Sequence, residues 1–209
     1  MKKVFPDSKQ LTKIEFWGGE PSYGLPRVHN TVRQVIKHYS NLSEFMMSTN
    51  LTTETWLDDF FGFLKVLGEF PERKFTFFLQ LSLDGPTKVN DLNRGKGTTE
   101  KFTKNFYKLI TNLDDFLKDV PNVNIRAHFK PTLDNYSIQL LQTKKDIIEY
   151  YQFFEQYKDI SLQVKNEKQW RLDLPIPNTA VPSPHTQADG ERFANLCKLS
   201  YEIALENKE

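Results

Sequence analysis

The stretch Lys13-Ile14-Glu15-Phe16-Trp17-Gly18-Gly19-Glu20-Pro21 decides how the rest of the chain is interpreted. A short apolar run ends abruptly in two glycines, a carboxylate and a proline, which is typical of a buried strand that breaks into a loop. Glycine leaves the backbone bare, so that a ligand can approach it closely, and proline cannot continue a central strand. The same residues also suit a tight strand-to-helix turn without a ligand, and this stretch alone favours that simpler interpretation.

Composition narrows the class of protein. The chain has 209 residues, of which 38% are hydrophobic and 26% are charged, with a net charge of +1. These values fit one ordinary globular core and give no argument for a nucleic-acid or membrane partner. No apolar run is long enough to span a membrane, and the N-terminal residues lack the apolar core of a signal peptide. We therefore expect a cytoplasmic protein.

Cysteine and histidine usage predicts no metal site. Cys197 is the single cysteine, which excludes an internal disulfide and a site built from several cysteines of this sequence. His29, His38 and His185 do not have ligand spacing, and we expect them at the surface.

Segments with strand character alternate with segments of helical period. The expected strands cover 14–17, 45–50, 74–83, 122–130 and 160–164, and the expected helices cover 26–39, 52–68, 98–118, 143–157 and 189–206. Residues 87–97 between them are expected to form a polar loop. This alternation predicts an α/β fold with parallel strands and right-handed crossovers.

The domain organisation follows from the same pattern. Residues 1–12 form a polar lead-in, and 13–165 hold the alternating strands and helices. Residues 166–186 have no period and are punctuated by four prolines, so we expect an ordered surface connection or a linker there. The last segment, 187–209, is expected to contain a C-terminal helix.

Polar residues follow three successive expected strands. They are Gly18-Gly19-Glu20-Pro21, Ser48-Thr49-Asn50 and Ser82-Leu83-Asp84-Gly85-Pro86. In a parallel sheet or barrel, ligands bind beyond the carboxyl ends of the strands, where these segments would converge. Each segment also has a structural explanation, because asparagine caps helices and Asp-Gly-Pro forms ordinary turns.

The fourth expected strand alternates polar and apolar residues. Asn124, Arg126, His128 and Lys130 share one face, which would point either into a barrel around a ligand or into solvent from an edge strand; the two interpretations have equal weight. Nearby, Asp91 and Arg94 could form a surface ion pair. The stretch 94–97, Arg-Gly-Lys-Gly, lacks the spacing of a phosphate-binding loop.

In this order, the three polar segments, together with Asp91 and Arg94, resemble the radical S-adenosylmethionine (SAM) enzymes. The similarity covers residues 13–165, and the most similar branch is that of the anaerobic sulfatase maturases and peptide-modifying enzymes. The resemblance implies a partial (β/α)6 TIM-like barrel whose first βα unit is missing, so that 13–165 would supply strands two to six.

The resemblance also implies a SAM site. Gly18, Gly19 and Glu20, followed by Pro21, would hold the amino group of the methionine part of SAM. Ser48, Thr49 and Asn50 would line the pocket, and Ser82 and Asp84 would lie near the ribose. Arg126 and His128, matched by strand position, would add polar groups. A zwitterionic ligand suits backbone groups exposed by glycine, with a carboxylate for its ammonium.

The sequence departs from the family at the iron–sulfur cluster. The family motif Cys-x-x-x-Cys-x-x-Cys, which precedes the Gly-Gly-Glu-Pro strand, is not found in the 209 residues, and Cys197 cannot replace three ligands. We therefore expect the SAM-binding part of a split or truncated enzyme that acts on a peptide, a protein or another substrate and is not catalytic alone. A 4Fe–4S cluster would need ligands from a second chain, which would also supply the first strand, or from a missing N-terminus.

Two alternatives remain open at this point. One is a degenerate, non-catalytic protein that binds SAM or a peptide or serves as a scaffold. The other, which has less support, is an unrelated barrel hydrolase or lyase that uses Glu20 and Asp84, although no nucleophile pairs with either carboxylate.

Overall fold

The computed structural model describes residues 11–133, 135–173 and 187–206. Its strands are β1 (Lys13–Phe16), β2 (Glu44–Thr49), β3 (Phe75–Leu81), β4 (Val123–Phe129) and β5 (Trp170–Asp173). Its helices are η1 (Pro21–Gly24), α1 (Leu25–His38), α2 (Trp56–Gly68), α3 (Thr87–Arg94), α4 (Thr98–Asp119), α5 (Asn135–Gln139), α6 (Lys144–Ser161) and α7 (Gln187–Glu206). None of the helices in these ranges combines the length and apolar character needed to cross a membrane.

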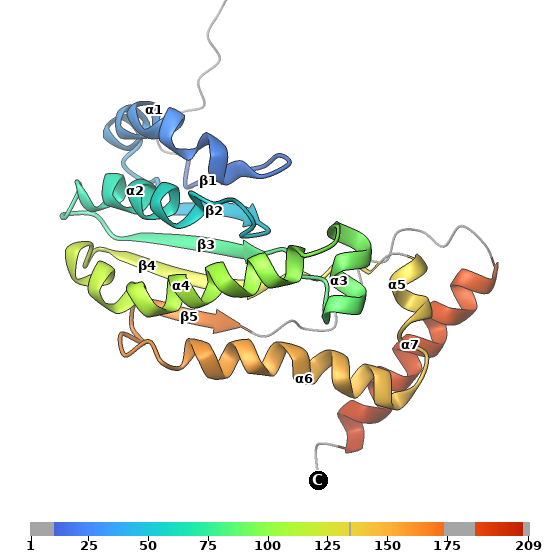
Figure 1. Ribbon diagram of the computed structural model, residues 1–209. Helices are drawn as coiled ribbons and strands as arrows, with labels where there is room; N and C mark the ends of the chain where they lie inside the picture. Colours follow the sequence, from blue (N-terminus) through green and yellow to red (C-terminus); the bar gives the residue numbers. More distant parts are fainter. Residues whose placement is uncertain (1–10, 134, 174–186, 207–209) are drawn as a thin grey trace, which may run out of the picture.

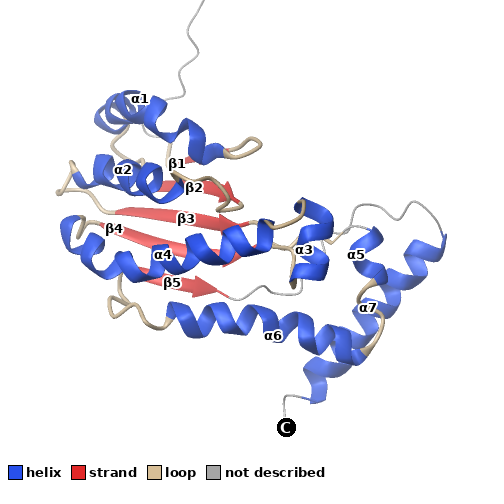
Figure 2. Ribbon diagram, viewed as in Figure 1, coloured by secondary structure: helices blue, strands red, loops and turns tan. Residues whose placement is uncertain are grey.

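The five described strands form one parallel sheet in the order β1-β2-β3-β4-β5 (Figure 1). Because each strand pairs with the next along the chain, right-handed crossovers place the connecting helices on the same side of the sheet. Figures 1 and 2 show α2 and α4 in front of the strands, α1 above β1 and α6 below β5. The predicted α/β class with parallel strands is confirmed, whereas closure into a six-stranded barrel stays a prediction.

Alternation along the strands separates two faces of the sheet. Phe45, Phe77, Ile125 and Trp170 lie side by side on neighbouring strands, and all four are buried under the helices. One residue further along, Met46, Phe78, Arg126 and Arg171 form the adjacent row on the opposite face, where both arginines are exposed. The core therefore lies between the sheet and its helices.

The core is built largely from aromatic rings, as the many phenylalanines predict. Phe63 of α2 packs edge-to-face against Phe45 and Phe77 of the sheet, with ring centroids 5.7 Å apart in both pairs. A second group joins Phe106 of α4, Phe129 of β4 and Tyr157 of α6. Edge-to-face geometry stabilises such pairs beyond their buried area, and the rings fix the helices against one face of the sheet.

The predicted strand at 160–164 is wrong. Residues Ile160 and Ser161 end α6, and β5 lies instead at Trp170–Asp173, within the segment expected to be a connection. A short apolar run cannot be assigned to a strand or to a buried helix end by periodicity alone. Here Ile160 continues the buried stripe of α6, whereas β5 is only four residues long.

The predicted loop at 87–97 is also wrong in part, because Thr87–Arg94 forms α3. The helix is only eight residues long, its sequence is largely polar, and only Val89 and Asn90 are buried, so that it gives a weak helical signal in the sequence. Most of the lead-in and all four prolines of the expected connection, Pro175, Pro177, Pro182 and Pro184, lie outside the described residues.

Candidate functional site

The site is built on the face of the sheet opposite the helices, which we call the open face. It comprises Lys13, Glu15, Trp17, Glu44, Met46, Ser48, Thr76, Phe78, Gln80, Ser82, Asn124, Arg126, His128, Lys130, Arg171 and Asp173. Parallel sheets are normally covered on both faces. An exposed parallel-sheet face that carries charged and polar side chains is therefore a candidate binding surface.

The Gly18-Gly19 turn presents bare backbone at the carboxyl end of β1. Gly18 has a φ of +152°, a conformation that side chains disfavour. A Cβ atom added at Gly18 or Gly19 would meet no other atom within 4 Å. The turn therefore leaves its backbone accessible, and binding of a ligand there stays a prediction.

Glu20 fixes this turn to the neighbouring strand. Its carboxylate accepts hydrogen bonds from the backbone N–H of Ser22 (3.2 Å) and of Asn50 (2.9 Å), which follows β2. Both carboxylate oxygens therefore support the loop. The Glu20 carboxylate already accepts these two hydrogen bonds. A ligand ammonium at this turn would therefore contact the backbone carbonyl groups beside it.

Ser48 and Ser82, both predicted at strand ends, lie together on the open face. The Ser48 hydroxyl accepts a hydrogen bond from Gln80 Nε2 (2.8 Å) and lies 3.2 Å from the Ser82 hydroxyl. Gln80, which sequence reasoning missed, belongs to this polar strip at the carboxyl ends of β2 and β3. Its signal was its place two residues before Ser82 in the period-two pattern of the strand.

Thr49 and Asn50 have structural partners instead. Thr49 is 2% exposed on the helix side, where its hydroxyl accepts hydrogen bonds from Trp56 Nε1 (2.9 Å) and from the backbone N–H of Leu51 (3.1 Å). The side chain of Asn50 closes a turn with Thr52. Neither side chain joins the polar strip of Ser48 and Ser82.

Asp84 is a buried structural centre. The carboxylate is 2% exposed and lies 2.8 Å from both Nε and Nη2 of Arg94. It also accepts hydrogen bonds from the backbone N–H of Thr132 (2.7 Å) and from Asn93 Nδ2 (3.3 Å). Asp84 thus ties the end of β3 to α3 and to the loop after β4. Arg94 pairs with Asp84 and not with Asp91, so that the surface ion pair which the sequence allowed is not the one formed.

Asp91 fills the place that an anion would take in the Arg-Gly-Lys-Gly turn. Its carboxylate accepts hydrogen bonds from the backbone N–H of Gly97 (2.6 Å) and Thr99 (2.9 Å) at the start of α4, and from the hydroxyls of Thr99 and Thr98. Burial by itself would raise the pKa of Asp91, but these hydrogen bonds outweigh it and lower the pKa to about 2.

We expect Asp91→Asn to lower the free energy of unfolding by about 2 kcal/mol at pH 7, because charge-assisted hydrogen bonds to a helix N-terminus are lost. The folded-state pKa lies below the ordinary value of 3.8, so the stabilisation is complete above about pH 5 and disappears as the pH falls toward 2. Urea unfolding at pH 7 and pH 2.5 measures both effects. An equal difference between variant and parent at the two pH values would contradict this assignment.

Arg126, His128 and Lys130 all belong to the open face. Arg126 is exposed in the middle of β4. Burial lowers the pKa of the half-buried His128, as do Lys130 and Lys13, while Asp173 opposes the shift. The imidazole is therefore neutral at pH 7. The charges that shift this pKa belong to Lys13 on β1, Lys130 after β4 and Asp173 on β5. Their combined effect on His128 supports their common placement on the open face.

Trp17 and Lys130 meet across the open face. The Lys130 ammonium lies 5.8 Å from the centroid of the Trp17 ring, although β1 and β4 are separated by two strands. Three strand spacings amount to about 14 Å, so both side chains must lean over the sheet. Trp17 is 60% exposed and donates a hydrogen bond to Glu15 (2.8 Å). Sequence reasoning had placed Trp17 at the end of a strand, directly before the Gly-Gly-Glu-Pro segment, and had given it no binding role.

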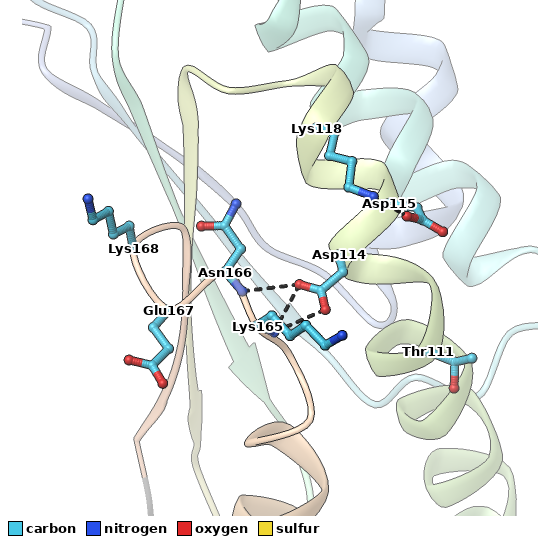
Figure 3. Close-up of a pocket in the computed structure, with 8 residues that line it drawn as sticks. All are labelled: Thr111, Asp114, Asp115, Lys118, Lys165, Asn166, Glu167 and Lys168. Atoms are coloured by element: carbon cyan, nitrogen blue, oxygen red, sulfur yellow. Dashed lines mark hydrogen bonds and ion pairs between the residues drawn. The ribbon is translucent and has the colours of Figure 1, made fainter.

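A separate hollow lies where α4 approaches the loop before β5 (Figure 3). There the Asp114 carboxylate accepts hydrogen bonds from the backbone N–H of Lys165 and Asn166. The exposed pair of Asp115 and Lys118 lies beside it. These contacts fix the loop onto α4 and leave no converging set of free polar groups among the labelled residues.

No known protein family, curated protein or solved structure matches this chain in sequence or structure comparisons.

Proposed function

We propose that this chain is the SAM-binding part of a radical SAM-type enzyme, with the open face and the Gly18-Gly19 turn as the binding surface. The observation that carries the proposal is the bare backbone at Gly18 and Gly19, next to the polar strip of Ser48 and Ser82. Backbone groups at the turn suit the ends of a zwitterion, and hydroxyls suit a ribose. SAM thus fits the residues present.

The iron–sulfur cluster does not fit the residues of this chain. Among the described residues, no three histidine, cysteine, aspartate or glutamate side chains are grouped to hold a metal, and Cys197 is exposed on α7. We therefore assign binding of SAM, and no catalytic step, to these 209 residues. Cluster ligands would come from a second chain or from another segment of a longer protein.

The proposed place for a second chain is the outer edge of β1, which pairs only with β2 among the described strands. An edge strand presents backbone groups to which another strand can be added. Such a partner would supply the missing first strand and the three cysteines. A peptide or protein substrate would then face the same open surface.

The second candidate function is binding of SAM or a peptide without radical chemistry, and the missing cluster ligands favour it for the chain acting alone. A hydrolase or lyase that uses Glu20 and Asp84 has less support. Both carboxylates are engaged in structural hydrogen bonds, and Asp84 is buried against Arg94.

Gly19→Ala is expected to weaken SAM binding about tenfold or more while it leaves the free energy of unfolding almost unchanged. The added methyl group meets no atom of the chain, but it occupies the space through which a ligand would reach the backbone. Calorimetric titration with SAM, together with urea unfolding, measures the two quantities.

Gly24→Ala is the matched control, because Gly24 lies in the same region and also has open space around its Cα. We expect it to retain SAM binding. Equal binding by the parent chain and Gly19→Ala would argue against a ligand at the turn.

A further inference from the structure

Two cations on the open face lack an ionic partner among the described residues. They are Arg126, which is exposed at the centre of β4, and Lys130, whose ammonium lies over the Trp17 ring. The other cations of the face are paired: Lys13 lies 2.6 Å from Glu15, and Arg171 lies 2.6 Å from Asp173. Positive charge is therefore unbalanced along β4.

The surface beside Arg126 is apolar. Met46 and Phe78 are half-buried in the same cross-strand row as Arg126, and Phe78 is its direct neighbour in register. Trp17 adds an exposed ring at the carboxyl end of the face. An unpaired guanidinium next to half-buried apolar side chains suits a ligand that carries both a carboxylate and hydrocarbon.

The charges of the face select among anionic ligands. Glu15, Glu44 and Asp173 lie among the cations of this face, so that an evenly charged polyphosphate backbone would place some of its phosphates beside carboxylates. An extended peptide has isolated carboxylates separated by neutral groups, and it can place them on Arg126 and Lys130 while it avoids the acidic side chains.

We propose that Arg126 and Lys130 form a carboxylate-binding site for acidic residues of an extended peptide that lies on the open face over Met46 and Phe78. The inference rests on the proposed function in one respect, because both take the open face as the ligand-binding surface. It adds the chemical class of the peptide and the two residues that select it.

The test is a titration of the full chain with a fluorescein-labelled peptide in which glutamate alternates with alanine, followed by anisotropy. A matched peptide with glutamine in place of glutamate is the ligand control. We expect saturable binding of the glutamate peptide that weakens with salt, about tenfold weaker binding for Arg126→Gln and for Lys130→Gln, and no change for the exposed Lys108→Gln, which lies on α4 on the other side of the sheet. The fluorescence of Trp17 shows whether the peptide binds on the open face. The other two tryptophans, Trp56 and Trp170, are only 0% and 5% exposed and do not meet a ligand at the surface.

Equal binding of both peptides, or full binding by Arg126→Gln, would overturn the inference, as would a preference for single-stranded DNA over the glutamate peptide. Circular dichroism of each variant establishes that the exposed substitutions leave the fold intact. A parallel SAM titration separates the two proposals. Peptide binding without SAM binding contradicts the proposed function alone, and SAM binding without peptide binding contradicts the carboxylate site alone.

Discussion

Replacing Asp84 by alanine is expected to lower the free energy of unfolding by about 3 kcal/mol, at the lower end of the range for removing one partner of a buried ion pair. The substitution leaves the Arg94 guanidinium, which is 25% exposed, without its counter-ion. It also removes the acceptor for the backbone N–H of Thr132. Urea unfolding followed by circular dichroism measures the loss.

Asp115→Asn is the matched control, because Asp115 pairs with Lys118 at the surface, where the side chain is 88% exposed. We expect little change in the stability of this variant, since exposed ion pairs contribute little. If Asp84→Ala were as stable as Asp115→Asn, Asp84 would not be the structural centre that its contacts describe, and its carboxylate would again be a candidate for ligand binding.

Gly85→Ala should destabilise the protein by about 3 kcal/mol through two separate effects, strain at a positive φ and overpacking. The φ of Gly85 is +137°, and an added Cβ would lie 2.5 Å from Cε2 of the buried Tyr150 ring. Since the ring is fixed in the core, the clash cannot be relieved cheaply. Thermal and urea unfolding both report the effect.

Gly95→Ala separates the two causes, because Gly95 also has a positive φ, +100°, but has open space around it. Backbone strain alone should lower the free energy of unfolding of this variant, by about 1–2 kcal/mol. Similar losses at Gly85 and Gly95 would show that Tyr150 does not constrain the turn. The double variant Gly85→Ala with Tyr150→Leu should lose less than the sum of its single changes.

The sequence predicted the layered architecture well because hydrophobic period is a local signal. The helix at 143–157 was marked by Thr143, which forms a capping box with Asp146 in the structure. The short strand β5 was misplaced because four residues carry almost no period, and α3 was missed because one of its few buried residues, Asn90, is polar.

The site was predicted in part, and the errors have one physical cause. Sequence order shows which residues end a strand, but it does not show on which side of the sheet each one points. Ser48 and Ser82 share the open face, whereas Thr49, one residue away, is buried under Trp56. The partner of Asp84 was missed because α3, which brings Arg94 back to the end of β3, was read as a loop.

The most direct test of the central claim is a 15N–1H nuclear magnetic resonance titration of the intact chain with SAM. We predict that SAM shifts the amide signals of Gly18, Gly19, Ser48 and Ser82, and that Gly19→Ala reduces these shifts while Gly24→Ala does not. Shifts confined to other regions, or no shifts at millimolar SAM, would contradict a SAM site on the open face.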